Sequence, residues 1–360
     1  MHIRQHIADI PAILRQKGVR KIIVSPGSRN APLINSFLKV FGDDCMSIID
    51  ERSAAYVALG VALFTDKPVV LLCTSGTAAL NYAPAMAEAF YQAVPLIAIT
   101  ADRPPEWIDQ QDNQTIRQHD IYAANIKASF SLPAEIHNEH DLWHVHRMVN
   151  EALNTAITRR KGPVHINVPL REPLYDDLPD PSNVNIISVH DGACLNGLDE
   201  RFIKVWQEAK SILIVAGQQP YQEALLKSLK AVEDKKRICI VGEPVSNINF
   251  EGVIRNPDLI LALHENNHDL DPELLIYFGG QVISNRLKQF LRSCNSEHTW
   301  FIDPAGRHID TFRKLTDIIL SSPAGFFSAL ASVNPIVESD YYLSWQKRAV
   351  SLKEKIINNP

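Results

Sequence analysis

The stretch VRKIIVSPGSRNAPL, residues 19–33, contains the pattern on which the fold depends. A short run of apolar residues, mostly β-branched, is followed by the turn residues SPG and then by helix-prone residues near 31–40. A short apolar run bounded by turn residues predicts a buried strand, here at 21–25. The passage from a buried strand through a tight corner into a helix is typical of a parallel α/β sheet.

The same pattern recurs through the first half of the chain. Further strands are expected at 47–50, 68–73, 96–100 and 164–168, and helices near 31–40, 52–65, 78–92 and 141–159. Three of these strands also end in a polar corner: DERS at 50–53, TSGTA at 74–78 and ADRPP at 101–105. Each corner alone has a structural explanation as a cap or a turn. Ligands of parallel sheets nevertheless gather at the carboxyl ends of strands, so the four corners form the candidate site.

A second set of strands and helices follows a linker. The segment at 169–185, PLREPLYDDLPDPSNVN, is rich in proline and acidic residues and lacks periodicity, as surface linkers do. Beyond it, strands are expected at 211–217, 237–243, 259–264, 274–280 and 299–304. We therefore expect two doubly wound α/β domains with mostly parallel sheets. Their limits are expected at 1–170 and 196–335, with a linker at 171–195 and the start of a third region at 336–360.

The composition is that of a globular protein with about two domains in 360 residues. No apolar run approaches the ~20 residues of a membrane span, and the N-terminus lacks a signal peptide's apolar core, which together favour the cytoplasm. A net charge of -5 argues against nucleic acid as a partner. The five cysteines include no C-x-x-C pair and are expected to be reduced, which excludes disulfide scaffolds and structural zinc.

Taken together, the four corners resemble the pyrimidine-binding domain of a known enzyme family. SPGSR, DERSA, TSGTA and ADRPPE occur in this order in the thiamine-diphosphate-dependent synthases of menaquinone biosynthesis, and NQTIRQ at 113–118 continues the resemblance. The second domain shares it less specifically, so it covers nearly the whole chain. The resemblance implies a pyrimidine-binding fold followed by a Rossmann-like middle domain. It also implies a transferase that decarboxylates 2-oxoglutarate and adds the succinyl carbanion equivalent to isochorismate.

Under this resemblance Glu51 has the clearest chemical role, as the catalytic and cofactor-binding glutamate. A carboxylic acid bonded to nitrogen N1′ of the aminopyrimidine makes the imino tautomer accessible, and that tautomer removes the proton from the thiazolium carbon. A partly apolar cleft would keep the pKa of such a glutamate in a useful range. The structural alternative is that Glu51 only favours the positive end of the following helix, worth up to about 1 kcal/mol. Without the resemblance, that alternative would be preferred.

The remaining site residues are also assigned by the resemblance. Both substrates are dicarboxylates, and guanidinium groups bind carboxylates in a two-pronged fashion that lysine cannot copy. In the cofactor corner, glycine would allow close approach of the backbone to a ring, and threonine would bond to it from a helix N-terminus. The expected substrate-binding residues are Ser28, Arg29, Arg103, Asn113, Gln114 and, from a looser match, Arg286; the expected cofactor-binding residues beside Glu51 are Gly76 and Thr77.

Three other features of the sequence do not predict a functional site. The sequence HENNH at 264–268 matches the zinc motif H-E-x-x-H, but its loop-like surroundings would not hold the required helix. Cys73 and Ser75 lack the flanking elbow and the histidine partner of a nucleophile. The second domain has neither a dinucleotide nor a P-loop fingerprint.

The third domain of the family, which binds the diphosphate through Mg²⁺, is not expected in this chain. Its Gly-Asp corner with an Asn-Asn pair roughly thirty residues on is not found, since Asn266-Asn267 has no Gly-Asp upstream at a suitable spacing and Asn358-Asn359 is at the terminus. We therefore expect a chain cut short and inactive alone, with no metal ligands of its own. Alternatives are another thiamine-dependent decarboxylase or acetohydroxyacid synthase, one subunit of a split enzyme, or a non-catalytic relative of the fold.

The resemblance further implies a homodimer or a dimer of dimers, because in the family the cofactor lies between subunits. The helix segments at 54–63 and 78–90 are the expected contact faces.

Overall fold

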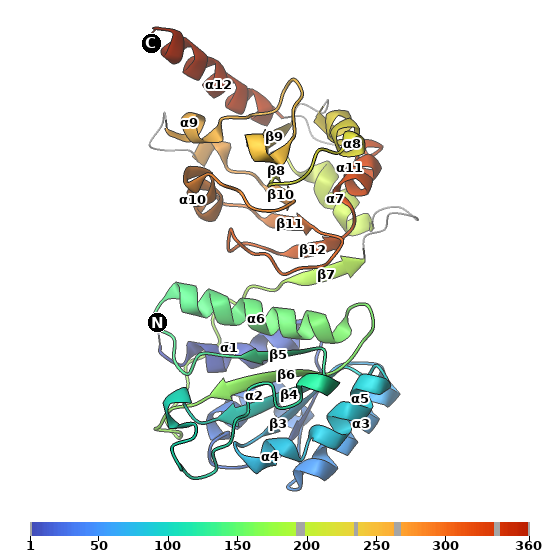
Figure 1. The fold of residues 1–360 in the computed structure, drawn as a ribbon, viewed down its shortest axis with the longest axis vertical. Helices are drawn as coiled ribbons and strands as arrows, with labels where there is room; N and C mark the ends of the chain where they lie inside the picture. The colour runs from blue at the N-terminus through green and yellow to red at the C-terminus, as the bar shows by residue number, and fades with distance from the viewer. Residues whose placement is uncertain (1, 192–198, 234–236, 263–267, 335–338, 359–360) are drawn as a thin grey trace. The chain divides into compact units, whose positions relative to one another are not determined.

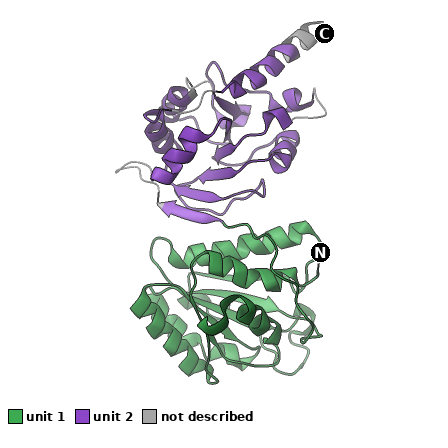
Figure 2. Ribbon diagram, turned by 180° about the vertical axis from the view of Figure 1, so that it is seen from behind, with its two compact units in different colours: residues 1–186 green, residues 187–360 purple. Residues whose placement is uncertain are grey.

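The computed structural model describes residues 2–191, 199–233, 237–262, 268–334 and 339–358. The chain divides into two compact units, residues 1–186 and 187–360, which are coloured separately in Figure 2. Each unit is built around one six-stranded parallel sheet. The expected fold class, two doubly wound α/β domains, is therefore confirmed.

The first unit has the sheet order β2-β1-β3-β4-β6-β5. Its strands are β1 (Lys21–Val24), β2 (Cys45–Ser47), β3 (Val69–Cys73), β4 (Leu96–Asp102), β5 (Ala128–Ser131) and β6 (Val164–Pro169). Its helices are α1 (Gln5–Gln16), α2 (Ala31–Phe41), α3 (Glu51–Thr65), α4 (Thr77–Leu80), α5 (Ala83–Tyr91) and α6 (Glu139–Ile157). Figure 1 shows these helices packed on the faces of the sheet.

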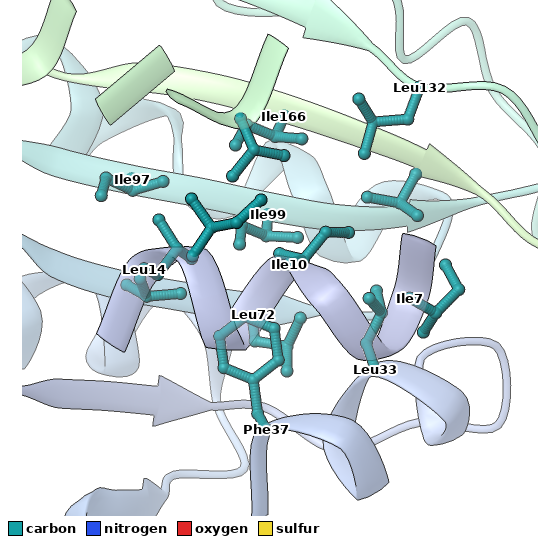
Figure 3. Packing of buried hydrophobic residues seen from close by; sticks show 14 of the residues in the cluster. Ile7, Ile10, Leu14, Leu33, Phe37, Leu72, Ile97, Ile99, Leu132 and Ile166 are labelled. Carbon is teal, nitrogen blue, oxygen red and sulfur yellow. The ribbon is translucent and has the colours of Figure 1, made fainter. Parts of the chain in front are cut away.

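Two apolar layers hold the first unit together, one on each face of its sheet. On one face α1, α2 and α6 cover the strands; Figure 3 shows Ile10 and Leu14 of α1 over Leu72, Ile97 and Ile99. On the other face the small side chains of α3, α4 and α5, mostly alanines, pack against β3 and β4. Strands buried on both faces read as continuous apolar runs, which is why the sequence predicts them well.

The second unit has the sheet order β7-β12-β11-β10-β8-β9. Its strands are β7 (Ser188–Asp191), β8 (Ile212–Ala216), β9 (Ile238–Gly242), β10 (Leu274–Phe278), β11 (His298–Ile302) and β12 (Asp317–Leu320). Its helices are α7 (Glu200–Glu208), α8 (Glu223–Glu233), α9 (Pro257–Ala262), α10 (Asn285–Ser293), α11 (Pro323–Ala331) and α12 (Tyr341–Asn358). Apolar clusters lie on both faces of this sheet as well.

One expected strand is wrong. The run at 259–264 was assigned to the sheet, but its residues up to 262 belong to helix α9. Pro257 stands at the helix start, and Pro257, Ile260 and Leu261 are buried along the helix. β9 pairs with β8 on one side, and an isolated bridge joins its Val241 to Ile254, which precedes α9. A short apolar run does not distinguish a buried strand from a buried helix by periodicity, and here the proline decides.

The expected limits of the linker and of the third region stay predictions. Within the range expected for the linker, residues 188–191 form β7. Near the C-terminus, Tyr341 and Trp345 of α12 are buried in an apolar cluster of the second unit, and the Tyr341 hydroxyl donates to the carbonyl of Leu270 at 2.7 Å. These two side chains therefore pack as part of the second unit.

Cys45, Cys73, Cys239 and Cys294 are free thiols, and Cys194 lies outside the described residues. Among the helices in the described part of the chain, none is long and apolar enough to cross a membrane.

Candidate functional site

The four polar corners lie at one edge of the first sheet. Strands β2, β1, β3 and β4 are neighbours and parallel, so their carboxyl ends meet there. Ser25 joins three of the strands: its backbone N–H donates to Leu72 of β3 at 2.8 Å, and its hydroxyl donates to the carbonyl of Ile48 after β2 at 2.9 Å. The sequence thus predicts both the corners and their common location.

The SPGSR corner is tightly packed against its neighbour on β3. A Cβ atom at Gly27 would lie 2.6 Å from the Cβ of Thr74, so only glycine fits. The Asn30 side chain closes the turn, accepting from the Gly27 N–H at 2.8 Å and donating to the Ser25 carbonyl at 3.0 Å. Ser28 is exposed beside this turn.

Glu51 is the first residue of α3, but it does not cap the helix. Asp50 does so, accepting from the Ser53 N–H at 2.8 Å. The Glu51 side chain is half-buried and makes no hydrogen bond or ion pair with any residue the structure describes. Capping by Asp50 therefore leaves Glu51 free of that role, and its interaction with the positive end of α3 stays the structural alternative.

The charge of Glu51 lies next to the end of β3. Burial raises the pKa of the Cys73 thiol well above its ordinary value, and the nearby negative charge of Glu51 adds to that rise. Cys73 is the last residue of β3 and directly precedes the TSGTA corner. A fully buried thiol with a raised pKa supplies no thiolate, in agreement with the sequence argument against a cysteine nucleophile.

The TSGTA corner has backbone geometry that requires glycine. Gly76 has φ of 81°, and a Cβ atom there would also lie 3.0 Å from the carbonyl oxygen of Gln114. The Ser75 hydroxyl donates to the same carbonyl at 3.1 Å. Thr77, the first residue of the short helix α4, is exposed. The corner therefore presents backbone groups and the Thr77 side chain. The NQTIRQ segment contacts it through the Gln114 carbonyl.

A hollow of about 340 Å³ lies beside the SPGSR and ADRPP corners. Its lining contains three cations, two carboxylates and two apolar side chains: Arg29, Arg103, Arg171, Asp112, Glu172, Pro104 and Trp107. Both arginines predicted from the first domain are thus brought together, and Ser28 neighbours one of them in sequence. A cluster of guanidinium groups of this kind suits an anionic ligand that presents carboxylates.

Each of the two predicted arginines is held by the protein. The Arg29 side chain is only 6% exposed, and its Nη1 donates to the Leu170 carbonyl at 2.9 Å. Arg103 donates from Nε and Nη2 to the Asn113 carbonyl at 3.1 and 2.8 Å, and its Nε lies 3.3 Å from Asp112. The guanidinium groups are therefore fixed in place before any ligand arrives.

Asn113 and Gln114 are exposed, and their backbones connect the two halves of the site. The Asn113 carbonyl accepts from Arg103, whereas the Gln114 carbonyl accepts from Ser75. Gln114 has φ of 55°, in the left-handed region. The roles of these side chains as substrate ligands stay predictions.

A buried polar chain beneath the site was missed by the sequence analysis. Gln118 accepts from the Gly76 N–H at 2.7 Å and donates to Asn167 Oδ1 at 3.0 Å. Asn167 then donates to Asp102 at 2.7 Å, and Asp102 accepts from the Arg103 N–H at 2.8 Å. The cofactor corner and the arginine corner are thus connected by three buried side chains. In the sequence, the only sign of this buried chain is Gln118, the second glutamine of NQTIRQ.

Two further members of this polar layer are Thr100 and His165. The Thr100 hydroxyl lies 2.7 Å from His165 Nε2. Burial lowers the pKa of His165 to about 3, so the ring is neutral at pH 7. Burial likewise raises the pKa of Asp102. The layer is therefore a hydrogen-bonded support with little net charge, apart from Asp102 itself.

Arg286, predicted as a substrate ligand, belongs to the second unit. It is exposed in the first turn of α10, whose N-cap is Ser284, which accepts from the Leu287 N–H at 2.9 Å. Its role stays a prediction. Of the zinc-like motif, residues 264–267 lie outside the described residues, and His268 pairs with Asp271 at 3.1 Å. Within the described ranges there is no group of three or more His, Cys, Asp or Glu side chains that could hold a metal ion.

Comparison with known proteins agrees with this arrangement. The family model of the N-terminal TPP binding domain of thiamine pyrophosphate enzymes matches residues 1–122, and the model described as the middle domain of thiamine pyrophosphate matches 187–358. The chain belongs to the thiamine pyrophosphate enzymes. The first match lies within the first unit of this family member, and the second begins where the second unit begins.

Three relatives carry the name 2-succinyl-5-enolpyruvyl-6-hydroxy-3-cyclohexene-1-carboxylate synthase. The relative from Porphyromonas gingivalis is 42% identical over 96% of this chain and 62% of its own length. The relative from Cytophaga hutchinsonii is 40% identical over 98% of this chain and 65% of its own length. The relative from Flavobacterium johnsoniae is 38% identical over 93% and 60%. The chain thus spans less than two thirds of the relatives it matches, and the resemblance to the synthases of menaquinone biosynthesis is confirmed.

Proposed function

We propose that this chain supplies the pyrimidine-binding and arginine-bearing part of a 2-succinyl-5-enolpyruvyl-6-hydroxy-3-cyclohexene-1-carboxylate synthase, a transferase of menaquinone biosynthesis. The reaction decarboxylates 2-oxoglutarate and joins the succinyl unit to isochorismate. The observation that carries the proposal is the common sheet edge, where the unpaired carboxylate of Glu51 and the anchored arginines Arg29 and Arg103 are placed by neighbouring strands.

The residues present fit the pyrimidine end of thiamine diphosphate. When bound, the cofactor would supply a carbon nucleophile that adds to the keto carbon of 2-oxoglutarate before CO2 leaves. Glu51 would accept the hydrogen bond from, or donate it to, ring nitrogen N1′, because its side chain has no partner among the described residues. Gly76 and Thr77 of the TSGTA corner would hold the ring, Thr77 from the start of α4.

The arginine hollow binds the carboxylates of the two substrates. Arg29 and Arg103 present fixed guanidinium groups, so little side-chain freedom is lost when a carboxylate binds. Ser28, Asn113 and Gln114 add hydrogen bonds at the exposed rim of the same site. Arg286, at the start of α10 in the second unit, is a further proposed substrate ligand.

Diphosphate and Mg²⁺ are bound, in this proposal, by residues other than those of the site described above. The relatives are longer than the region that they share with this chain. We assign the binding of diphosphate and Mg²⁺ to that additional length. By itself, the 360-residue chain is expected to be inactive.

A fusion experiment tests the proposed function. The chain is joined to the segment of the Porphyromonas gingivalis relative that follows the matched region, and product formation from 2-oxoglutarate and isochorismate is followed by mass spectrometry with thiamine diphosphate and Mg²⁺ present. The fusion is expected to form the product, whereas the chain alone is not. The intact relative is the positive control. A folded fusion that binds the cofactor but forms no product would contradict the proposal.

A further inference from the structure

Glu172 occupies the arginine hollow with its own carboxylate. Its Oε1 lies 3.3 Å from Nη2 of Arg29 and 3.9 Å from Nη1 of Arg103. Within the described part of the chain, Glu172 is the only acidic side chain in an ion pair with Arg29. A single carboxylate of the protein therefore lies between the two guanidinium groups that the proposed function assigns to substrate.

The backbone on both sides of Glu172 is fixed to the first unit. Arg4, which is almost fully buried, donates from Nη2 to the Arg171 carbonyl at 3.1 Å and from Nη1 to the carbonyl of Pro173. Arg171 itself pairs with Glu106 and Glu135. Because these contacts do not involve the Glu172 side chain, replacing its charge leaves the backbone of this segment in place.

The arginines, in turn, do not need Glu172 to stay in position. Arg29 is buried and bonded to the Leu170 carbonyl, and Arg103 is held by Asn113 and Asp112. The Glu172 side chain, by contrast, is 72% exposed, and its two ion pairs are long. Ion pairs with an exposed member are weak, because water screens them and the long side chain keeps its freedom.

We propose that Glu172 is a built-in competitor for the substrate carboxylate. In the empty site it pairs with Arg29 and, together with Asp112, with Arg103. One carboxylate of an incoming dicarboxylate takes its place between the two arginines while Glu172 turns to solvent. The inference rests on the proposed function for the choice of ligand. In this role, Glu172 lowers the affinity of the hollow for carboxylates and selects for anions able to displace it. Glu172 does not contact the reacting atoms.

Calorimetry on the full chain with succinate, a simple dicarboxylate, tests this inference. Glu172→Gln keeps the size and hydrogen-bonding ability of the side chain but removes its charge. We expect Glu172→Gln to bind succinate about two- to fivefold more tightly than the unchanged chain, the range that the weak exposed pairs imply. Glu139→Gln, at an exposed glutamate in the first turn of α6, makes the same charge change away from the hollow and should leave the affinity unchanged.

Succinamide, the neutral analogue, controls for effects unrelated to charge and should not respond to the substitution. Equal or weaker binding of succinate by Glu172→Gln would overturn the inference, as would the absence of binding to both proteins. This result can be distinguished from that of the fusion experiment. Tighter binding of succinate by Glu172→Gln together with an inactive fusion would support the competitor role and reject the proposed function. An active fusion with unchanged succinate binding would support the proposed function and reject the competitor role.

Discussion

Gln118 is the first side chain of the buried polar chain that joins the two halves of the site. It is 1% exposed and bonds to the Gly76 N–H, the Ala101 carbonyl and Asn167. A buried polar group that loses its partner costs about 1–3 kcal/mol. We therefore expect Gln118→Leu to lower the free energy of unfolding of the first unit by about that amount, as measured by urea denaturation. Gln110→Leu, at an exposed glutamine, should have almost no effect, and equal effects of the two substitutions would contradict this role.

The same residue shows where prediction from sequence stops at this scale. Glu51, Arg29 and Arg103 could be predicted because each follows a recognisable buried strand in a distinctive corner. Gln118 and Asn167 could not, because their burial depends on the pairing of β4 with β6, which are separated by more than sixty residues. Glu172 was also missed, since the return of the linker past Arg4 to the arginine hollow leaves no periodic signal.

At the scale of elements, α3 presents one covered and one uncovered apolar face. Ala54, Ala55 and Ala58 pack against the sheet, whereas Val57 and Leu63 are 39% and 49% exposed. We take the uncovered face as the proposed contact between two copies of the chain. An unpaired charge in such a contact is costly.

Leu63→Glu is accordingly expected to weaken self-association at least about tenfold, which corresponds to about 1.4 kcal/mol. Size-exclusion chromatography with light scattering across a concentration series measures it. Leu38→Glu, on α2 at the opposite face of the sheet and 47% exposed, is the matched control. A monomer at every concentration for the unchanged chain, or an equal effect of both substitutions, would refute this contact face.

Some of the strands could be predicted from the sequence, and others could not. The strands buried on both faces were predicted to within a few residues, whereas β5, β7 and β12 were missed. The side chains of β5 are half-buried or exposed, so its sequence lacks the continuous apolar run of the central strands. The wrong strand at 259–264 had such a run, and only its position after Pro257 distinguishes the observed helix.

At the scale of the whole molecule, the chain combines two thiamine pyrophosphate enzyme domains with a site that the first domain builds almost alone. Its sheet edge places Glu51, the TSGTA corner and the arginine hollow in one unit, and a buried polar chain connects them. The second unit contributes Arg286 in the proposal, from an exposed position on α10. We therefore propose that Glu51 of the first unit activates the cofactor.

Hydrogen exchange at the thiazolium C2 carbon of thiamine diphosphate tests that claim most directly. The rate is measured by NMR in deuterated buffer for the fusion described above and for its Glu51→Gln variant. Because proton transfer by a positioned group contributes about 10²- to 10⁴-fold, we predict that the variant exchanges at least about 100-fold more slowly. Its melting temperature should stay unchanged, since Glu51 has no hydrogen-bond partner among the described residues. Equal exchange rates in the two proteins, with the cofactor bound to both, would contradict the account.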